Sequence, residues 1–379
     1  MTTTLQMVRD LLPEIVKHAD EVERVRGLPE QLLDGLRAAG CLRMLAPVEH
    51  GGAGLSVPDT LRVVETLGTA DGSVAWMVGQ VALSQLIIGC APAATVAAIF
   101  ADGPDVYAAG AVAPKGRATE VDGGWRISGQ WPFVTGCERA AWVYLNCVLV
   151  RGRAVALDGD RPATRIMLLP AADVTVVDTW HTLGLRGTGS HDLAVSGGFC
   201  PAERAVELVP GSATAARAAM SIAQSSLIIA AAALGVAEAA LRDVVELAAG
   251  GKRPALSAKR LAASAAFQER LGEARMVVQA GRALLYDQGR DEWGGYAGPD
   301  AALRRAQVRA VAAQATALAV RATDAAFELA GGTAVYDSSP LSRRLRDVNT
   351  ARQHFVASRN SYAAFGAHLV GEGGDGGPL

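Results

Sequence analysis

The segment W125-R-I-S-G-Q-W-P-F-V-T-G-C-E-R-A-A-W-V143 lies in a part of the chain that is rich in strand-forming residues. Short runs of Val, Ile, Trp and Tyr occur from about residue 106 to 208, and turn sequences such as D-G-G and R-G-R separate them. Residues of these types fit the pleated surface of a sheet, whereas Gly and Asp favour turns. The pattern predicts a small domain of several antiparallel strands over residues 106–210.

Helical patterns flank this β domain on both sides. Apolar residues recur at helical spacing before it, and long Ala-rich segments follow it. We therefore expect an α+β, mainly α fold with a helical N-terminal domain (1–105), the β domain (106–210) and a C-terminal four-helix bundle (211–370). The tail 371–379 lacks core residues and is expected to be disordered. The predicted bundle helices span residues 213–249, 257–290, about 299–330 and about 341–369.

Composition excludes several classes of function. The 379 residues carry a net charge of only −2, so no basic surface indicates binding to nucleic acid or to anionic lipid. The uncharged stretches 72–101 and 218–237 resemble membrane spans, but a large core explains them better. The five Cys form no C-x-x-C pair, so no metal site is expected. The N-terminus is charged and unlike a signal peptide, which predicts a cytoplasmic protein.

The usual nucleotide-binding signatures are absent from the sequence. No G-x-G-x-x-G follows a predicted strand, and no phosphate-binding G-x-x-x-x-G-K-[ST] occurs. The segment G184-L-R-G-T-G189 has the wrong spacing for either motif. A Rossmann dehydrogenase and a P-loop enzyme are therefore not expected.

Four segments in a fixed order identify a family instead, and they extend over nearly the whole chain. Together they resemble the acyl-CoA dehydrogenase superfamily, and the resemblance covers roughly residues 10–370. It implies a helical domain, a β domain and a four-helix bundle, assembled as a homotetramer (a dimer of dimers) with flavin between domains and subunits. The segments begin PVEHGGAGLS (residues 47–56), WRISGQW (residues 125–131), WHTLGLRGTGS (residues 180–190) and ELAGGT (residues 328–333).

The resemblance assigns flavin to the PFVTG segment, residues 132–136. On a strand, Phe133 and Thr135 face the same side, and Gly136 permits close approach of the backbone. In the family the aromatic ring flanks the isoalloxazine, and the hydroxyl meets N5. An ordinary strand with a core Phe is the alternative interpretation.

Further candidates for flavin or substrate contact come from the other motifs. Gly331 and Gly332 follow a long helix and resemble the turn that contacts the phosphate part of flavin, often in a neighbouring subunit; a plain helix end is the alternative. Arg186 can pair with phosphate, and Ser190 can donate to phosphate or to the ring. The family pattern places this loop, with Trp180, against flavin or substrate; a surface ion pair is the alternative for Arg186. Trp76 is a candidate for the substrate pocket or for the core.

The dehydrogenase pattern fails at its catalytic base. The family places a Glu either at the position of Phe355 or at about Ser225, and neither residue can remove a proton. His354 lies one position earlier and resembles the His of the flavin-dependent monooxygenase branch. A helix through 342–369 would place Arg343, Asp347 and His354 on one face.

The sequence therefore predicts a monooxygenase that uses reduced FMN or FAD and O2 through a C4a-hydroperoxyflavin attended by His354. A separate reductase would supply the flavin, and the substrate would be a small organic molecule. Residues 108–118 contain no His, which leaves C-, N- and S-oxygenation open. The alternatives are a dehydrogenase or oxidase with an atypical base, and a binding protein without activity.

Overall fold

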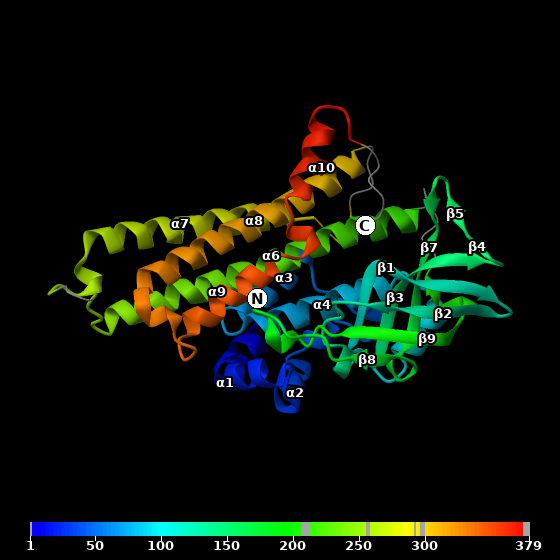
Figure 1. The fold of residues 1–379 in the computed structure, drawn as a ribbon, viewed down its shortest axis with the longest axis horizontal. Coiled ribbons are helices and arrows are strands. Elements are labelled where there is room, and N and C mark those ends of the chain that lie inside the picture. Colours follow the sequence, from blue (N-terminus) through cyan, green and yellow to red (C-terminus); the bar gives the residue numbers. More distant parts are fainter. Residues whose placement is uncertain (1, 207–212, 255–257, 292, 296–299, 374–379) are drawn as a thin grey trace.

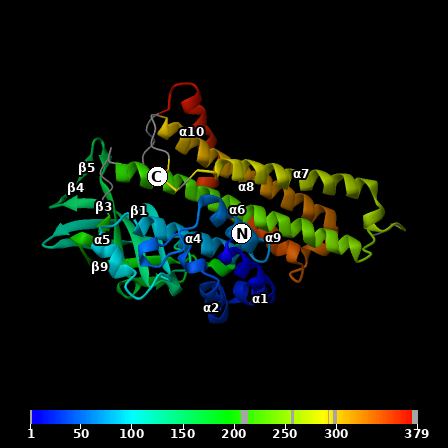
Figure 2. The same ribbon diagram turned by 180° about the vertical axis from the view of Figure 1, so that it is seen from behind.

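A computed structural model describes residues 2–206, 213–254, 258–291, 293–295 and 300–373. Five helices come first, the β domain follows, and long helices end the chain (Figure 1). The β domain lies at one end of the molecule, and the long helices extend away from it (Figures 1 and 2). The N-terminal helices are α1 (Thr3–Val25), α2 (Glu30–Ala38), α3 (Val57–Gly68), α4 (Gly72–Ile88) and α5 (Ala93–Ile99).

The expected fold class is confirmed, with one correction to the sheet, which is mixed rather than antiparallel. Its strands follow the order β10-β7-β3-β1-β2-β9-β8, and β1 and β3 run parallel. The strands are β1 (Ala108–Val121), β2 (Gly124–Trp131), β3 (Trp142–Arg151), β4 (Ala154–Val155), β7 (Thr164–Pro170), β8 (Thr175–Val177), β9 (Asp192–Pro201) and β10 (Ala205–Val206), with a separate pair β5 (Leu157–Asp158) and β6 (Arg161–Pro162).

The parallel pair follows from the order of the strands. β2 returns beside β1 as a hairpin, and β3 lies along the opposite edge of β1. β2 and β3 are therefore antiparallel, with β1 between them. Residues 132–141 pass the end of β1 to connect β2 with β3, and this β2–β3 connection includes the PFVTG segment.

The bundle consists of α6 (Ala213–Ala249), α7 (Ala265–Gln288), α8 (Ala301–Ala330) and a shorter pair, α9 (Pro340–Ala351) and α10 (Asn360–Leu369). Among the described residues one helix segment, Ala218–Ala249, has the length and hydropathy of a membrane span, and 94% of that apolar window is buried inside the fold. Small residues let α6 approach α3 closely, since a Cβ on Gly235 would lie 2.2 Å from the Glu65 carbonyl oxygen. The apolar stretch is thus a core helix of the bundle.

The predicted single helix over 341–369 is wrong. Helix α9 ends at Ala351, a short 3₁₀ turn spans Phe355–Ala357, and α10 begins at Asn360. His354 has an extended backbone, with φ −64° and ψ 139°. The segment between the helices contains aromatic, β-branched and Ser residues, which are weak helix formers, so packing decides its conformation. Residues 374–379 of the predicted tail lie outside the described residues.

Candidate functional site

Trp76 brings together two residues that are distant in sequence. Its Nε1–H donates to the Thr135 hydroxyl at 3.2 Å, and its ring meets the His354 ring edge-on, with centroids 5.4 Å apart. Trp76 lies on α4, Thr135 in the connection between β2 and β3, and His354 between two bundle helices. The candidate site therefore forms where the three parts of the fold meet.

Phe133 is not on a strand, contrary to the sequence-based expectation. Strand β2 ends at Trp131, and Phe133 has a φ of 64°, in the left-handed region that non-glycine residues rarely adopt. Its side chain is 72% exposed, and its ring approaches Trp180 edge-on at 6.3 Å. The strained backbone thus presents an aromatic face that neighbouring residues leave uncovered.

Gly136 is required by its own turn and packing. It has a φ of 67°, and a Cβ there would lie 1.9 Å from the Tyr107 hydroxyl oxygen. Glycine is therefore required by the turn and by the packing of Tyr107. This requirement holds whether or not a ligand approaches the backbone.

Three buried hydroxyls continue inward from Trp76. Thr135 Oγ1 lies 2.9 Å from Ser190 Oγ, which lies 2.7 Å from Thr188 Oγ1. Thr188 Oγ1 in turn donates to the carbonyl oxygen of Leu185 at 2.8 Å. Ser190 and Thr135, both predicted from the sequence, are thus in direct contact, while Thr188 was not singled out.

Trp180 is held in place by the loop that precedes β9. Its indole N–H donates to the Leu185 carbonyl at 3.0 Å, and its backbone N–H donates to His191 Nδ1 at 3.2 Å. The buried His191 accepts a second bond from the Thr179 N–H, so it orders the loop. Trp180 therefore supports Phe133 and has little surface of its own free.

Arg186 forms protein contacts. Its Nε donates to the Thr182 carbonyl at 2.8 Å, and its guanidinium lies 3.6 Å from the Glu23 carboxylate. Arg343 and Arg346 also pair with Glu23, so α1 and α9 are joined there. Burial opposes ionisation of Glu23, but the Arg partners prevail and lower its pKa. These contacts match the ion-pair interpretation of Arg186.

Asp347 holds the loop that carries Leu185, a role that the sequence did not reveal. Its buried Oδ1 accepts a hydrogen bond from the Leu185 backbone N–H at 2.6 Å. Burial, and then the nearby Asp71, raise the pKa of Asp347 to about 7. Asp71 caps α4 by accepting from the Ser73 and Val74 N–H groups. The Arg-Asp pair at 346–347 was visible in the sequence, but its partner in the Leu185 loop was not.

The imidazole of His354 places a buried nitrogen atom, Nδ1, in apolar surroundings. Its Nδ1 is buried, and none of the described residues supplies it with a hydrogen-bond partner. Desolvation by burial lowers its pKa to about 4, so the ring is neutral near pH 7. Because α9 ends at Ala351, His354 does not share a helix face with Arg343 and Asp347, and that expectation is wrong. The cluster around Trp76 consists of Leu185, Ile229, Ala351 and Val356.

The two family positions for a carboxylate base remain without one. Phe355 is 56% exposed and packs its ring 4.6 Å from that of His354. Ser225 is buried and donates to the Ile222 carbonyl at 2.6 Å. Asp347 Oδ1 accepts from the Leu185 loop, and its buried Oδ2, which no described residue bonds, faces Gly72.

Gly331 and Gly332 do not join this site within one chain. They follow α8 at the end of the bundle that points away from the β domain (Figure 1). There they line a cavity of about 600 Å³ together with Lys252, Phe267 and Tyr336. Any shared role with Thr135 would require a second copy of the chain.

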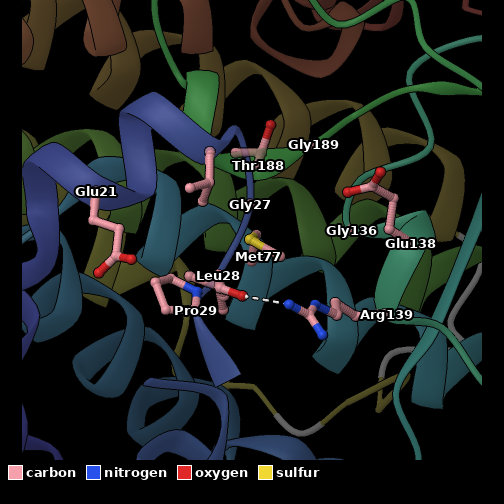
Figure 3. Close-up of a pocket in the computed structure, with 11 residues that line it drawn as sticks. Glu21, Gly27, Leu28, Pro29, Met77, Gly136, Glu138, Arg139, Thr188 and Gly189 are labelled. Atoms are coloured by element: carbon pink, nitrogen blue, oxygen red, sulfur yellow. Dashed lines mark hydrogen bonds between the residues drawn. The ribbon is translucent and has the colours of Figure 1, made fainter. Parts of the chain in front are cut away.

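A smaller cavity lies beside the buried hydroxyls. It has a volume of about 200 Å³ and is bounded by the α1–α2 link, Gly136 and Thr188 (Figure 3). On one wall Arg139 donates to the Leu28 carbonyl at 3.2 Å (Figure 3). Pockets for drug-sized ligands are larger, roughly 300–1,000 Å³. This cavity is therefore smaller than the usual pocket for a drug-sized ligand.

The residues at the site fit a flavin ring. Phe133 offers an uncovered aromatic ring, and Thr135, two residues further along the chain, offers a hydroxyl. The unpaired Nδ1 of His354 is the kind of buried polar atom that a ligand completes. The set combines an apolar wall with a few convergent polar groups, as cofactor sites do.

Comparison with known proteins identifies the family of the chain. Two models match, one described as "Acyl-CoA dehydrogenase, N-terminal domain" over residues 2–94 and one as "Acyl-CoA dehydrogenase, C-terminal domain" over residues 227–359. The chain belongs to the acyl-CoA dehydrogenase superfamily. The predicted family is thereby confirmed.

Several similar proteins are named as monooxygenases. The oxygenase subunit HsaA of a flavin-dependent monooxygenase from Mycobacterium tuberculosis is 26% identical, over 97% of this chain and 95% of its own. An indole-3-acetate monooxygenase from Acinetobacter baumannii is 28% identical, over 89% and 86%. The structure of XiaF from Streptomyces sp., in complex with FADH2 and glycerol, matches with a TM-score of 0.89 and 27% identity, over 97% and 95%. The predicted branch of the superfamily is confirmed.

Proposed function

We propose that this protein is the oxygenase component of a two-component flavin-dependent monooxygenase, which transfers one atom of O2 to a small organic molecule. The observation that carries the proposal is His354, whose buried, unpaired Nδ1 stands beside Trp76 where dehydrogenases of the superfamily have a carboxylate nearby. Full-length relatives named as flavin-dependent monooxygenases support it.

The chain's own residues have separable tasks. Phe133 would flank the ring with its exposed face, and Thr135 would meet the N5 edge. His354 is neutral near pH 7, so its Nδ1 can bond to a polar oxygen-derived group without burying a charge. The apolar cluster around Trp76 keeps water from that group. Reduced flavin, when bound, supplies the electrons that activate O2.

Reduced flavin, as FADH2 or reduced FMN, would come from a separate reductase. The names of the relatives support this arrangement, since HsaA is an oxygenase subunit and XiaF holds FADH2. Among the described contacts, Arg186 already has Glu23 as a partner, so we assign it a positioning role rather than a phosphate contact.

We also propose a homotetramer in which Gly331 and Gly332 complete the flavin site of a neighbouring copy. Their place beside the 600 Å³ cavity at the far end of the bundle supports this. Light scattering coupled to gel filtration tests it: a monomer would contradict the shared site.

A dehydrogenase or oxidase with an atypical base is the second candidate. Its base would have to be a carboxylate near the ring, yet Phe355 and Ser225 occupy the family positions. Asp347 is buried and bonded to Leu185. These contacts favour the oxygenase.

An anaerobic titration separates the two candidates. The protein is mixed without O2 with reduced FMN or FADH2, and the change in flavin fluorescence is followed. The proposal expects saturable binding of the reduced flavin, and the tighter of the two identifies the cofactor. Oxidised FAD that remains with the protein through purification and is bleached by an acyl-CoA would establish the dehydrogenase instead.

A further inference from the structure

The hydroxyls of Thr135, Ser190 and Thr188 form a row linked by hydrogen bonds, with a protein partner at each end. Trp76 Nε1 stands at one end, 3.2 Å from Thr135 Oγ1, and the Leu185 carbonyl oxygen stands at the other, 2.8 Å from Thr188 Oγ1. All three hydroxyl side chains are buried. Each hydroxyl has one proton and two lone pairs, so the protons of the row can be assigned.

The assignment starts at the carbonyl end. A carbonyl oxygen has no proton, so its 2.8 Å contact with Thr188 Oγ1 requires the Thr188 proton to lie between them. The same carbonyl also accepts from the Trp180 indole and from the Thr188 backbone N–H. Since Thr188 donates its proton to that carbonyl, Ser190 must be the donor in the 2.7 Å contact between Ser190 and Thr188.

The donors of the remaining hydrogen bonds, at Thr135, can be assigned in the same way. Because Ser190 donates its proton to Thr188, it must accept in its 2.9 Å contact with Thr135, and Thr135 is the donor there. At its other side Thr135 accepts from Trp76, because an indole N–H can only donate. Thr135 is left with one free lone pair and no free proton. It therefore presents a hydrogen-bond acceptor to any ligand.

The two redox states of flavin differ at the atom that meets this group. N5 carries a hydrogen in reduced flavin and donates, whereas N5 of oxidised flavin has only a lone pair and accepts. We propose that Ser190 and Thr188 make the site selective for reduced flavin, by holding the Thr135 proton away from N5. This inference rests on the proposed function, since it requires flavin at Thr135.

Oxidised flavin can bind to Thr135 only at a cost. The Thr135 hydroxyl would have to turn its proton from Ser190 towards N5, and one hydrogen bond of the row would be lost. A net hydrogen bond between neutral groups corresponds to about a threefold to tenfold change in affinity. Ser190 and Thr188 act through Thr135 and are positioning residues.

The test compares the dissociation constants of oxidised flavin and anaerobically reduced flavin in matched variants. Ser190→Ala removes the acceptor for the Thr135 proton. Thr188→Val leaves the Ser190 proton free to turn towards Thr135, which again releases the Thr135 proton. In both variants we expect the ratio of the oxidised to the reduced constant to fall about threefold to tenfold. Thr188→Ser retains the hydroxyl and should keep the native ratio.

Two results would overturn the inference in distinguishable ways. If both flavins bind and the ratio is the same in the native chain, Ser190→Ala and Thr188→Val, the row does not set the preference, while the proposed function stands. If the native chain binds neither flavin, the proposed function fails and the inference fails with it. Should Ser190→Ala not fold, Thr188→Val decides alone, because Leu185 keeps its bond from Trp180.

Discussion

Asp347 accepts a hydrogen bond from the backbone N–H of Leu185 at 2.6 Å, although 162 residues separate them in the chain. The contact joins α9 of the bundle to the loop that carries Trp180 and Ser190. Both partners are buried. The position of the candidate flavin residues in the β domain thus depends on a carboxylate from the bundle.

Two replacements of Asp347 should distinguish the effect of its hydrogen bond on stability from the effect of its charge. Asp347→Ala leaves the buried Leu185 N–H without a partner, which costs about 1–3 kcal/mol. Asp347→Asn retains an acceptor oxygen and removes the repulsion from Asp71, so it should cost clearly less. Urea unfolding at pH 7 measures both. Equal losses in the two variants would contradict the assigned bond.

Stability should depend on pH through His354. Its folded-state pKa of about 4 lies below the roughly 6.5 of an exposed His. The unfolded chain therefore binds the proton more readily, and the free energy of unfolding falls as pH falls from about 6.5 to about 4. The native chain should lose on the order of 1–3 kcal/mol more than His354→Gln over this window.

Asp347 provides the internal comparison for that experiment. Its pKa is raised, so its contribution to stability is lost as pH rises towards about 7, opposite to that of His354. Native chain and His354→Gln share Asp347, so their difference isolates the imidazole. Parallel curves for the two proteins would show that the His354 ring is not desolvated in the fold.

Trp76 should contribute mainly through its ring. Trp76→Phe loses the Nε1 bond to Thr135 but retains an aromatic ring against His354, and we expect a loss of about 0.5–1.5 kcal/mol. Trp76→Ala opens a cavity and should cost about 3–5 kcal/mol. Thermal and urea unfolding of the two variants check the order. A smaller loss for Ala than for Phe would be inconsistent with the buried packing.

Gly184 should tolerate no side chain. A Cβ there would lie 2.2 Å from the Arg346 backbone oxygen, so Gly184→Ala must push the loop away from α9, at about 1–3 kcal/mol or more. Gly272→Ala is the control, since it meets open space on α7 and should stabilise the helix by up to about 1 kcal/mol. Opposite signs in urea unfolding are expected, and a neutral Gly184→Ala would argue against this loop position.

Elements fixed by local pattern were predictable from the sequence. The predicted helix over 213–249 coincides with α6, because a long Ala-rich segment leaves few alternatives. The order of the three parts followed from the change between helical and strand patterns. His354, Trp76 and Thr135 were each singled out, but on motif grounds alone.

The rest depended on contacts between distant segments. Phe133 lies in the connection between β2 and β3 with a positive φ, a conformation that no turn residue such as Gly or Asn marks in the sequence at that position. The break after Ala351 places His354 against Trp76, a contact between distant parts of the chain that helical spacing cannot reveal. Thr188 and the Asp347–Leu185 bond were missed for the same reason.

The most direct test of the account is the reoxidation of flavin followed by stopped-flow absorbance. The native chain and His354→Ala are each loaded with reduced flavin without O2 and then mixed with O2. We predict that the native chain delays the appearance of oxidised flavin well beyond the time seen in free solution, and that His354→Ala shortens this delay. Reoxidation at the free-solution rate in both proteins would contradict the assignment of an oxygenase.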